Sequence, residues 1–283
     1  MKVLSLFDGM SCGQIALKEL GIIPEVYYAS EIDKNAIAMT MYNFPNTVQL
    51  GNVMEVDARK LGHIDLLIGR SPCTNFSFAG RRNGMNTKGG DDNETIEIYT
   101  LEHYLKLKAE GFQFDGESFL FWEYMRILGE LRETNPNVLF FLENVEMGEK
   151  WESCLTKAIG IRGVHINSAL VSAQTRKRIY WTNIRTKTEG LFGWVEPDIP
   201  QPKDRGILLQ DVLEDNVDEK YYLKQEVVDK LLGAVCNEDK KSDSPKAEET
   251  VDNTTIPDDE GEDVLNGKPL EGLGLDGTED VHP

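Results

Sequence analysis

The sequence contains few cysteines, and their spacing shows neither a metal site nor a disulfide framework. The 283 residues include four cysteines: Cys12, Cys73, Cys154 and Cys236. They are far apart and lack the paired spacing of zinc ligands. Disulfide frameworks are typical of small secreted domains rather than of chains of this length. We therefore expect reduced thiols and no bound metal.

Long apolar runs and a signal peptide are also lacking. No apolar run approaches the roughly 18 residues that a membrane-spanning helix needs. Residues 1–7 have the pattern of a buried strand, without the apolar core and cleavage site of a secretory signal. The sequence thus predicts a protein that has no membrane partner and stays in the cytoplasm where it is made.

Positive charge is scarce, which argues at first against a nucleic-acid partner. The net charge is −19, but residues 235–283 hold 15 acidic and only 4 basic residues. The rest of the chain is mildly acidic, and its basic residues gather at Arg81 and Arg82 and again at Arg176, Lys177 and Arg178. Local patches rather than net charge decide contact with phosphates, so the overall charge leaves room for such a partner.

Short apolar runs alternate with segments of helical spacing. Buried strands are predicted at residues 3–7, 26–30, 65–69 and 138–142, and helices at about 14–20, 34–42, 101–108 and 119–133. Residues 168–173 and 179–182 are expected to form a strand–turn–strand pair. This alternation is typical of an α/β fold with a mostly parallel sheet and helices on both faces. Ligands bind beyond the carboxyl ends of the strands in such sheets.

The composition changes near Cys236. Residues 237–263 consist mainly of charged and small polar residues with almost nothing to bury, a composition typical of disorder. We expect a folded domain over residues 1–185, a small region over 186–234 and an acidic, disordered tail over 235–283.

The first motif is a run of small residues after the first strand, Phe7-Asp8-Gly9-Met10-Ser11-Cys12-Gly13. Small residues let the backbone approach a ligand, and the following helix N-terminus favours negative charge. Glu31, at the end of the second strand, can accept hydrogen bonds from two ribose hydroxyls. A tight strand-to-helix turn and a surface acid are the alternative interpretations.

The second motif is Ser71-Pro72-Cys73, after a buried strand. Proline holds the cysteine rigidly at the sheet edge, where a thiolate would be an effective nucleophile. The alternative is an inert, buried thiol. Residues 78–93 are long, polar and rich in glycine and asparagine, so they form either a lid over the substrate or a disordered connection.

Two further motifs carry charge. Glu143-Asn144-Val145 ends an apolar strand, where partial burial of a carboxylic acid suits general acid catalysis. In Gln174-Thr175-Arg176-Lys177-Arg178, the alternating arginines of an extended segment point the same way, toward a phosphate or a base carbonyl. A strand-end acid and a solvated basic strand are the alternatives.

Together, in this order, the four motifs and Glu31 resemble the DNA cytosine-5 methyltransferases, over about residues 1–185. The Phe7-Asp8-Gly9 form is similar to the branch that contains the eukaryotic de novo enzymes and their bacterial and phage relatives. The resemblance implies a Rossmann-like fold that binds S-adenosylmethionine, releases S-adenosylhomocysteine and acts on a cytosine flipped out of double-stranded DNA.

The resemblance also implies the site residues. Cys73 would attack carbon 6 of the base, Glu143 would protonate ring nitrogen 3, and Arg178 would bind the base carbonyl with support from Arg176. Glu31 would hold the ribose, and Ile32 would pack on adenine. The remaining cofactor-binding positions that it implies are Phe7, Asp8, Gly9, Met10, Ser11, Gly13, Asn52, Ser71 and Pro72.

Three features depart from the family pattern. Asn52 stands where the family has an aspartate that binds the adenine amine, and Arg70 stands where a small residue precedes Ser-Pro-Cys. We expect the first change to weaken cofactor binding without abolishing it. The motifs that follow the recognition region in the family are not found, so residues 186–234 would hold only a small or truncated one.

These departures leave several alternatives. The chain is either an active enzyme, in a restriction-modification system or a phage, or a catalytically inactive homologue with a binding or regulatory role. A partner chain that supplies the missing motifs is a further alternative, and a DNA mimic that uses the acidic tail is the least favoured. In each active form, the protein would lie on DNA in the cytoplasm of a bacterial or phage-infected cell.

Overall fold

The computed structural model describes residues 1–72, 86–89, 94–190 and 193–232. Within these residues the labelled α-helices are α1 (Cys12–Glu19), α2 (Lys34–Asn43), α3 (Leu101–Ala109), α4 (Leu120–Thr134) and α5 (Glu149–Ile159), and residues 225–232 are also helical. The strands are β1 (Lys2–Leu6), β2 (Val26–Ser30), β3 (Val48–Gln49), β4 (Leu66–Gly69), β5 (Asn86–Gly89), β6 (Glu94–Glu97), β7 (Leu139–Val145), β8 (Val164–Asn167), β9 (Lys177–Thr182), β10 (Thr186–Glu189) and β11 (Trp194–Pro197).

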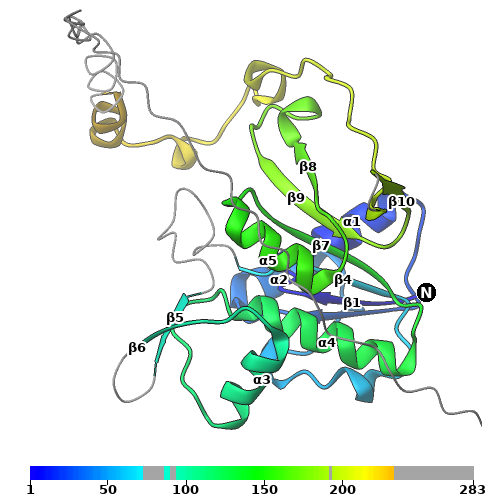
Figure 1. Ribbon diagram of the computed structural model, residues 1–283. Helices are drawn as coiled ribbons and strands as arrows, with labels where there is room; N and C mark the ends of the chain where they lie inside the picture. Colours follow the sequence, from blue (N-terminus) through cyan, green and yellow to red (C-terminus); the bar gives the residue numbers. More distant parts are fainter. Residues whose placement is uncertain (73–85, 90–93, 191–192, 233–283) are drawn as a thin grey trace, which may run out of the picture. The chain divides into compact units, whose positions relative to one another are not determined.

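The described residues form a seven-stranded sheet in the order β3-β2-β1-β4-β7-β9-β8 (Figure 1). The first five strands in this order are parallel, whereas β9 is antiparallel to both β7 and β8. The strand order reverses direction between β1 and β4. Such a switch point leaves a crevice beyond the carboxyl ends of the strands. The α/β class and the mostly parallel sheet are confirmed.

Alternating residues of β1 divide the core between the two faces of the sheet. Leu4 and Leu6 belong to the large apolar cluster that also contains the buried residues of α4 and α5. Val3 belongs to a smaller cluster with Leu17 of α1. Helices therefore cover both faces, as expected, with α4 and α5 on one and α1 on the other.

The predicted strand at residues 168–173 is wrong. The antiparallel partner of β9 is β8, Val164–Asn167, and Ser168–Leu170 form a 3-10 turn. The Asn167 side chain accepts hydrogen bonds from the backbone N–H groups of Ala169 and Arg176, at 3.1 and 3.0 Å. These hydrogen bonds to the Asn167 side chain stabilise a turn, so the chain does not continue as an extended strand.

The domain boundaries expected at residues 185 and 234 stay predictions. By its contacts, the chain divides after Asp215, and residues 216–232 are the described part of the second unit. The β10–β11 hairpin lies in the first unit, where Arg162 N–H donates to the Val195 carbonyl at 2.9 Å.

The acidic tail at 235–283 lies outside the described residues. So does most of the predicted lid at 78–93, of which residues 86–89 form β5, paired with β6.

Candidate functional site

The loop between β1 and α1 has an unusual backbone. Phe7 and Ser11 have positive φ angles of 55° and 60°, and Gly9 has a φ of 59°. Residues with a Cβ rarely adopt this region, and such strained positions are found mostly where a loop serves function. The loop is nevertheless fixed, because Asp8 N–H donates to the Ser30 carbonyl of β2 at 3.2 Å.

The Asp8 carboxylate is used within the protein. It accepts hydrogen bonds from the Tyr27 hydroxyl, at 2.9 Å, and from the Ser11 hydroxyl. Burial of the phenol and the nearby Asp8 charge raise the pKa of Tyr27. Tyr27 also explains why residue 13 is a glycine, because a Cβ at this position would lie 2.7 Å from the Tyr27 hydroxyl oxygen. Asp8 and Gly13 thus stabilise the loop through their contacts with Tyr27. Their contact with a cofactor stays a prediction.

Glu31 joins the carboxyl ends of β1 and β2. Its Oε2 accepts the Gly9 N–H at 2.8 Å, and its Oε1 accepts the N–H groups of Ile32 and Asp33 at 2.8 and 2.9 Å. These bonds fix the carboxylate at the edge of the sheet where β1 and β2 end. Beside it, the apolar residues Ile32 and Met10 are 70% and 55% exposed. A fixed acid between exposed apolar surfaces is suited to a ligand with a polar and a flat apolar part.

Asn52 follows β3 at the same edge of the sheet and is exposed. Its Oδ1 accepts the Met54 N–H at 3.0 Å, so the side chain caps the 3-10 turn Val53–Glu55. Just before it, the Ser30 hydroxyl donates to the Gly51 carbonyl at 2.8 Å. The Asn52 amide oxygen therefore accepts one hydrogen bond and keeps one lone pair for another partner.

The turn after β4 is tied to β7. Asn144 is fully buried, and its Nδ2 donates to the Ser71 hydroxyl at 2.9 Å. The Asn144 Oδ1 accepts the Val145 N–H at 2.8 Å. Ser71 is itself fully buried and its hydroxyl helps to hold the turn, and its contact with a cofactor stays a prediction. Pro72 is the last described residue of the turn, and Cys73 lies outside the described residues.

Three guanidinium groups surround the Glu143 carboxylate, which is 14% exposed. Arg178 Nε lies 2.7 Å from Glu143 Oε1, and Arg176 Nη2 lies 3.8 Å from the same oxygen. Arg70 Nε lies 3.6 Å from Oε2. Arg176 and Arg178 thus point the same way, as their alternation predicted. Glu143 lies within β7 rather than after it, because the strand continues to Val145.

Tyr180 lies directly opposite Glu143 on the neighbouring strand β9. Burial and the charge of Glu143 raise the pKa of this phenol, so it is neutral at physiological pH. Neither Tyr27 nor Tyr180 was predicted as a site residue, and Asn144 was predicted only as part of the Glu-Asn-Val motif. Only the pairing of β9 with β7 reveals Tyr180, whereas the Glu-Asn-Val motif was a signal for Asn144.

In the part of the chain that the structure describes, no group of three or more His, Cys, Asp or Glu side chains is placed to hold a metal ion. Among those same residues, no helix has the length and apolar character to cross a membrane. Cys12 and Cys154 are free thiols.

Comparison with known proteins shows a likeness to one family over the first third of the chain. Residues 1–99 match the C-5 cytosine-specific DNA methylases. These residues include the loop after β1, Glu31, Asn52 and the Ser-Pro-Cys turn. The family resemblance inferred from the motifs is therefore confirmed.

Curated relatives extend the likeness beyond residue 99. The chain is 27% identical over 249 residues to the orphan methyltransferase M.Rho11sI of Bacillus phage rho11s, covering 82% of this chain and 47% of that protein. It is 28% identical over 276 residues to the putative type II methyltransferase M.BsuMIIP of Bacillus subtilis, covering 82% and 61%. The chain thus spans between about half and three fifths of the length of these methylases.

Two solved structures share the fold. S. pombe Dnmt2 methyltransferase has a TM-score of 0.53 at 17% identity, covering 82% of this chain and 67% of that one. A mutant of Spodoptera frugiperda DNMT2 has a TM-score of 0.51 at 23% identity, covering 79% and 62%. At these identities the likeness supports the Rossmann-like methyltransferase fold.

Proposed function

We propose that this chain transfers a methyl group from S-adenosylmethionine to carbon 5 of cytosine in DNA, through a covalent bond between Cys73 and a flipped-out base. The observation that carries the proposal is the convergence at one sheet edge of two groups: the fixed Glu31 carboxylate and the Glu143–Arg178 pair. The match of residues 1–99 to the C-5 cytosine-specific methylases supports the assignment of cofactor and substrate.

The cofactor half of the site fits S-adenosylmethionine. Three backbone N–H groups fix the orientation of the Glu31 oxygens and occupy three of their about four acceptor positions, which leaves one on Oε2 for a ribose hydroxyl. The 70% exposed Ile32 offers an apolar surface to the adenine ring. The strained loop over residues 7–11 would follow the methionine part with its backbone. When bound, S-adenosylmethionine supplies the methyl group and becomes S-adenosylhomocysteine.

The catalytic half activates the base. The Cys73 thiolate forms a bond to carbon 6, while Glu143 gives a proton to ring nitrogen 3, so that the electron pair becomes available at carbon 5. Carbon 5 takes the methyl group. Loss of the carbon 5 proton to a base then breaks the bond to sulfur and frees the thiolate, and ring nitrogen 3 returns its proton to the Glu143 carboxylate. Arg178 holds both Glu143 and the base carbonyl, and neutral Tyr180 borders the pair.

Replacing Glu31 is expected to weaken cofactor binding. Glu31→Gln removes the carboxylate charge. It also replaces one of the two acceptor oxygens by an NH2 group, which donates hydrogen bonds and cannot accept them. We expect the Kd for S-adenosylmethionine to rise by about tenfold or more, the effect of losing a charge-assisted hydrogen bond. Isothermal titration calorimetry measures it. Glu25→Gln, just before the amino end of the same strand, is the matched control, and an equal loss in both variants would contradict the role of Glu31.

Restoring a carboxylate at position 52 is expected to strengthen cofactor binding. In Asn52→Asp, one oxygen keeps the cap on Met54 N–H and the other is free to accept a hydrogen bond from the adenine amine. We expect a decrease in Kd of about fivefold to tenfold, from one additional hydrogen bond of about 1 kcal/mol. Asn43→Asp, at the exposed end of α2, makes the same change of charge and should leave the Kd unchanged. Unaltered affinity in Asn52→Asp would show that residue 52 does not face adenine.

The proposed reaction is tested with the purified chain, S-adenosylmethionine labelled in its methyl group and DNA free of methylated cytosine. We expect label to enter the DNA as 5-methylcytosine. Label on another base would contradict the proposed site chemistry. Binding of S-adenosylmethionine without transfer, by folded protein, would favour the inactive or partner-dependent homologue.

A further inference from the structure

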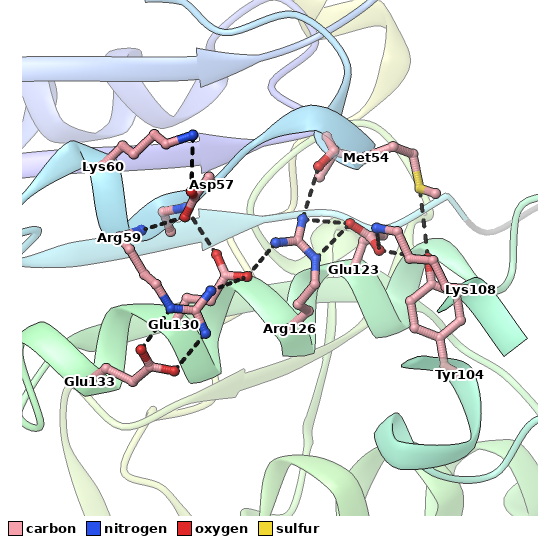
Figure 2. Close-up of polar contacts among 12 residues, drawn as sticks. Met54, Asp57, Arg59, Lys60, Tyr104, Lys108, Glu123, Arg126, Glu130 and Glu133 are labelled. Atoms are coloured by element: carbon pink, nitrogen blue, oxygen red, sulfur yellow. Dashed lines mark hydrogen bonds and ion pairs between the residues drawn. The ribbon is translucent and has the colours of Figure 1, made fainter. Parts of the chain in front are cut away.

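A network of charged side chains lies inside the molecule, between α4 and the segment that follows β3. At its centre is Arg126, whose side chain is only 13% exposed. Arg126 Nη2 lies 2.6 Å from Glu123 Oε2, and Nη1 lies 2.6 Å from Glu130 Oε1 (Figure 2). The two carboxylates are 0% and 7% exposed. One helix therefore places two acids and the arginine between them against the core.

Other groups complete the network and balance its charge. Lys108 Nζ and the Tyr104 hydroxyl both donate to Glu123 Oε1 at 2.6 Å. At the other end, Arg59 lies 3.1 Å from Glu130 and makes two hydrogen bonds of 2.7 Å with Glu133 (Figure 2). Burial alone would raise the pKa of Glu123, but its hydrogen bonds with Arg126, Lys108 and Tyr104 outweigh burial and lower it. The acid is therefore ionised in the folded protein.

The network binds the backbone directly after Asn52. Arg126 Nη2 also donates to the Val53 carbonyl at 3.2 Å. Glu130 Oε2 accepts the Ala58 N–H at 3.0 Å. α4 thereby holds both ends of the segment 53–58, which carries the Met54 N–H that orients Asn52. The segment connects the network to the edge of the proposed cofactor site.

We propose that Arg126 and Glu130 are positioning residues for the adenine end of the cofactor. They act through the backbone of residues 53–58, which sets the place of the Asn52 side chain. The proposal rests on the proposed function, because it takes S-adenosylmethionine to bind beside Asn52. Buried ion pairs contribute little net stability compared with apolar packing, so this network serves better to fix a geometry than to strengthen the fold.

Arg126→Lys tests the proposal. A lysine keeps one positive charge between the two acids but lacks the planar fork of donors that also reaches the Val53 carbonyl. We expect the Kd for S-adenosylmethionine to rise about tenfold, the loss expected for one hydrogen bond from a charged donor. Because the effect lies at the adenine end, the Kd for adenosine alone should rise by the same factor. The kcat at saturating S-adenosylmethionine should remain near that of the unaltered protein.

Two further variants separate positioning from folding. Arg132→Met removes a positive charge from the exposed side of α4 and should leave both Kd values unchanged. Glu130→Gln retains an acceptor for the Ala58 N–H but loses its charge, and it gives a second measurement should Arg126→Lys not fold. We expect Glu130→Gln to raise both Kd values as well.

The outcomes distinguish this inference from the function on which it rests. Folded Arg126→Lys or Glu130→Gln with unchanged affinity for both ligands, or with a fall in kcat alone, would overturn the positioning role. If the unaltered protein binds neither S-adenosylmethionine nor adenosine, the proposed function itself fails.

Discussion

Cys73→Ala is expected to abolish methyl transfer, with a fall in rate of more than about three orders of magnitude. Alanine provides no sulfur to attack carbon 6, and without that bond carbon 5 of cytosine is a poor nucleophile. Cofactor binding should persist, because Gly9 and Glu31 follow β1 and β2, whereas Cys73 follows β4. The measurement is the rate of methyl transfer to DNA, with the Kd for S-adenosylmethionine determined in parallel.

A covalent trap makes this prediction specific. In DNA that contains 5-fluorocytosine, carbon 5 carries fluorine in place of the proton that must leave, so the bond to sulfur cannot be broken. The unaltered protein should form a complex with this DNA that survives denaturation, and Cys73→Ala should not. Cys236→Ala, a change in the acidic C-terminal segment, should behave like the unaltered chain. A trapped complex with Cys73→Ala would exclude Cys73 as the nucleophile.

Glu143→Gln is expected to lower kcat by about two to three orders of magnitude while leaving the Kd for the cofactor unchanged. A glutamine fits the place of Glu143 beside Arg178 but has no acidic proton to give to ring nitrogen 3. Single-turnover rates at saturating cofactor measure the chemical step directly.

The neighbouring acid Glu146 provides the control for Glu143. Glu146 lies just beyond β7, is 37% exposed and pairs with Lys177 at 3.6 Å. Glu146→Gln should leave the single-turnover rate within about twofold of the unaltered protein, as expected for an exposed ion pair worth less than about 1 kcal/mol. Equal losses in the two variants would indicate a general effect of charge near β9. Loss of cofactor affinity in Glu143→Gln would contradict the assigned role.

The α/β fold could be predicted because its strands and helices have clear local signals. The apolar runs at 3–7, 26–30, 65–69 and 138–142 correspond to β1, β2, β4 and β7. The strand expected at 168–173 failed because the short apolar run at residues 169–171 has the composition of a buried strand. Such a run alone does not reveal that the Asn167 side chain accepts hydrogen bonds from two backbone N–H groups and stabilises a turn.

The residue types of the site could be predicted from the sequence, but the hydrogen bonds and ion pairs between residues far apart in the chain could not. Glu31 and Glu143 could be expected at one edge of the sheet, since the carboxyl ends of parallel strands meet there. Arg178 reaches the same edge from the amino end of β9, which is antiparallel to β7. The bond between Asn144 and Ser71 joins residues 73 positions apart, and helical spacing predicts α4 without revealing that its acids Glu123 and Glu130 are buried. Charged residues are normally expected on the solvent face of a helix, and only tertiary structure shows the partners that compensate their burial.

The central claim is that this chain methylates carbon 5 of cytosine in DNA by means of Cys73. Mass spectrometry of nucleosides from the DNA of a bacterial host that lacks cytosine methylation tests it most directly, and no knowledge of the target sequence is needed. Expression of the unaltered chain should produce 5-methylcytosine, and expression of Cys73→Ala should produce none. The absence of 5-methylcytosine with folded, unaltered protein, or its presence with Cys73→Ala, would contradict the account.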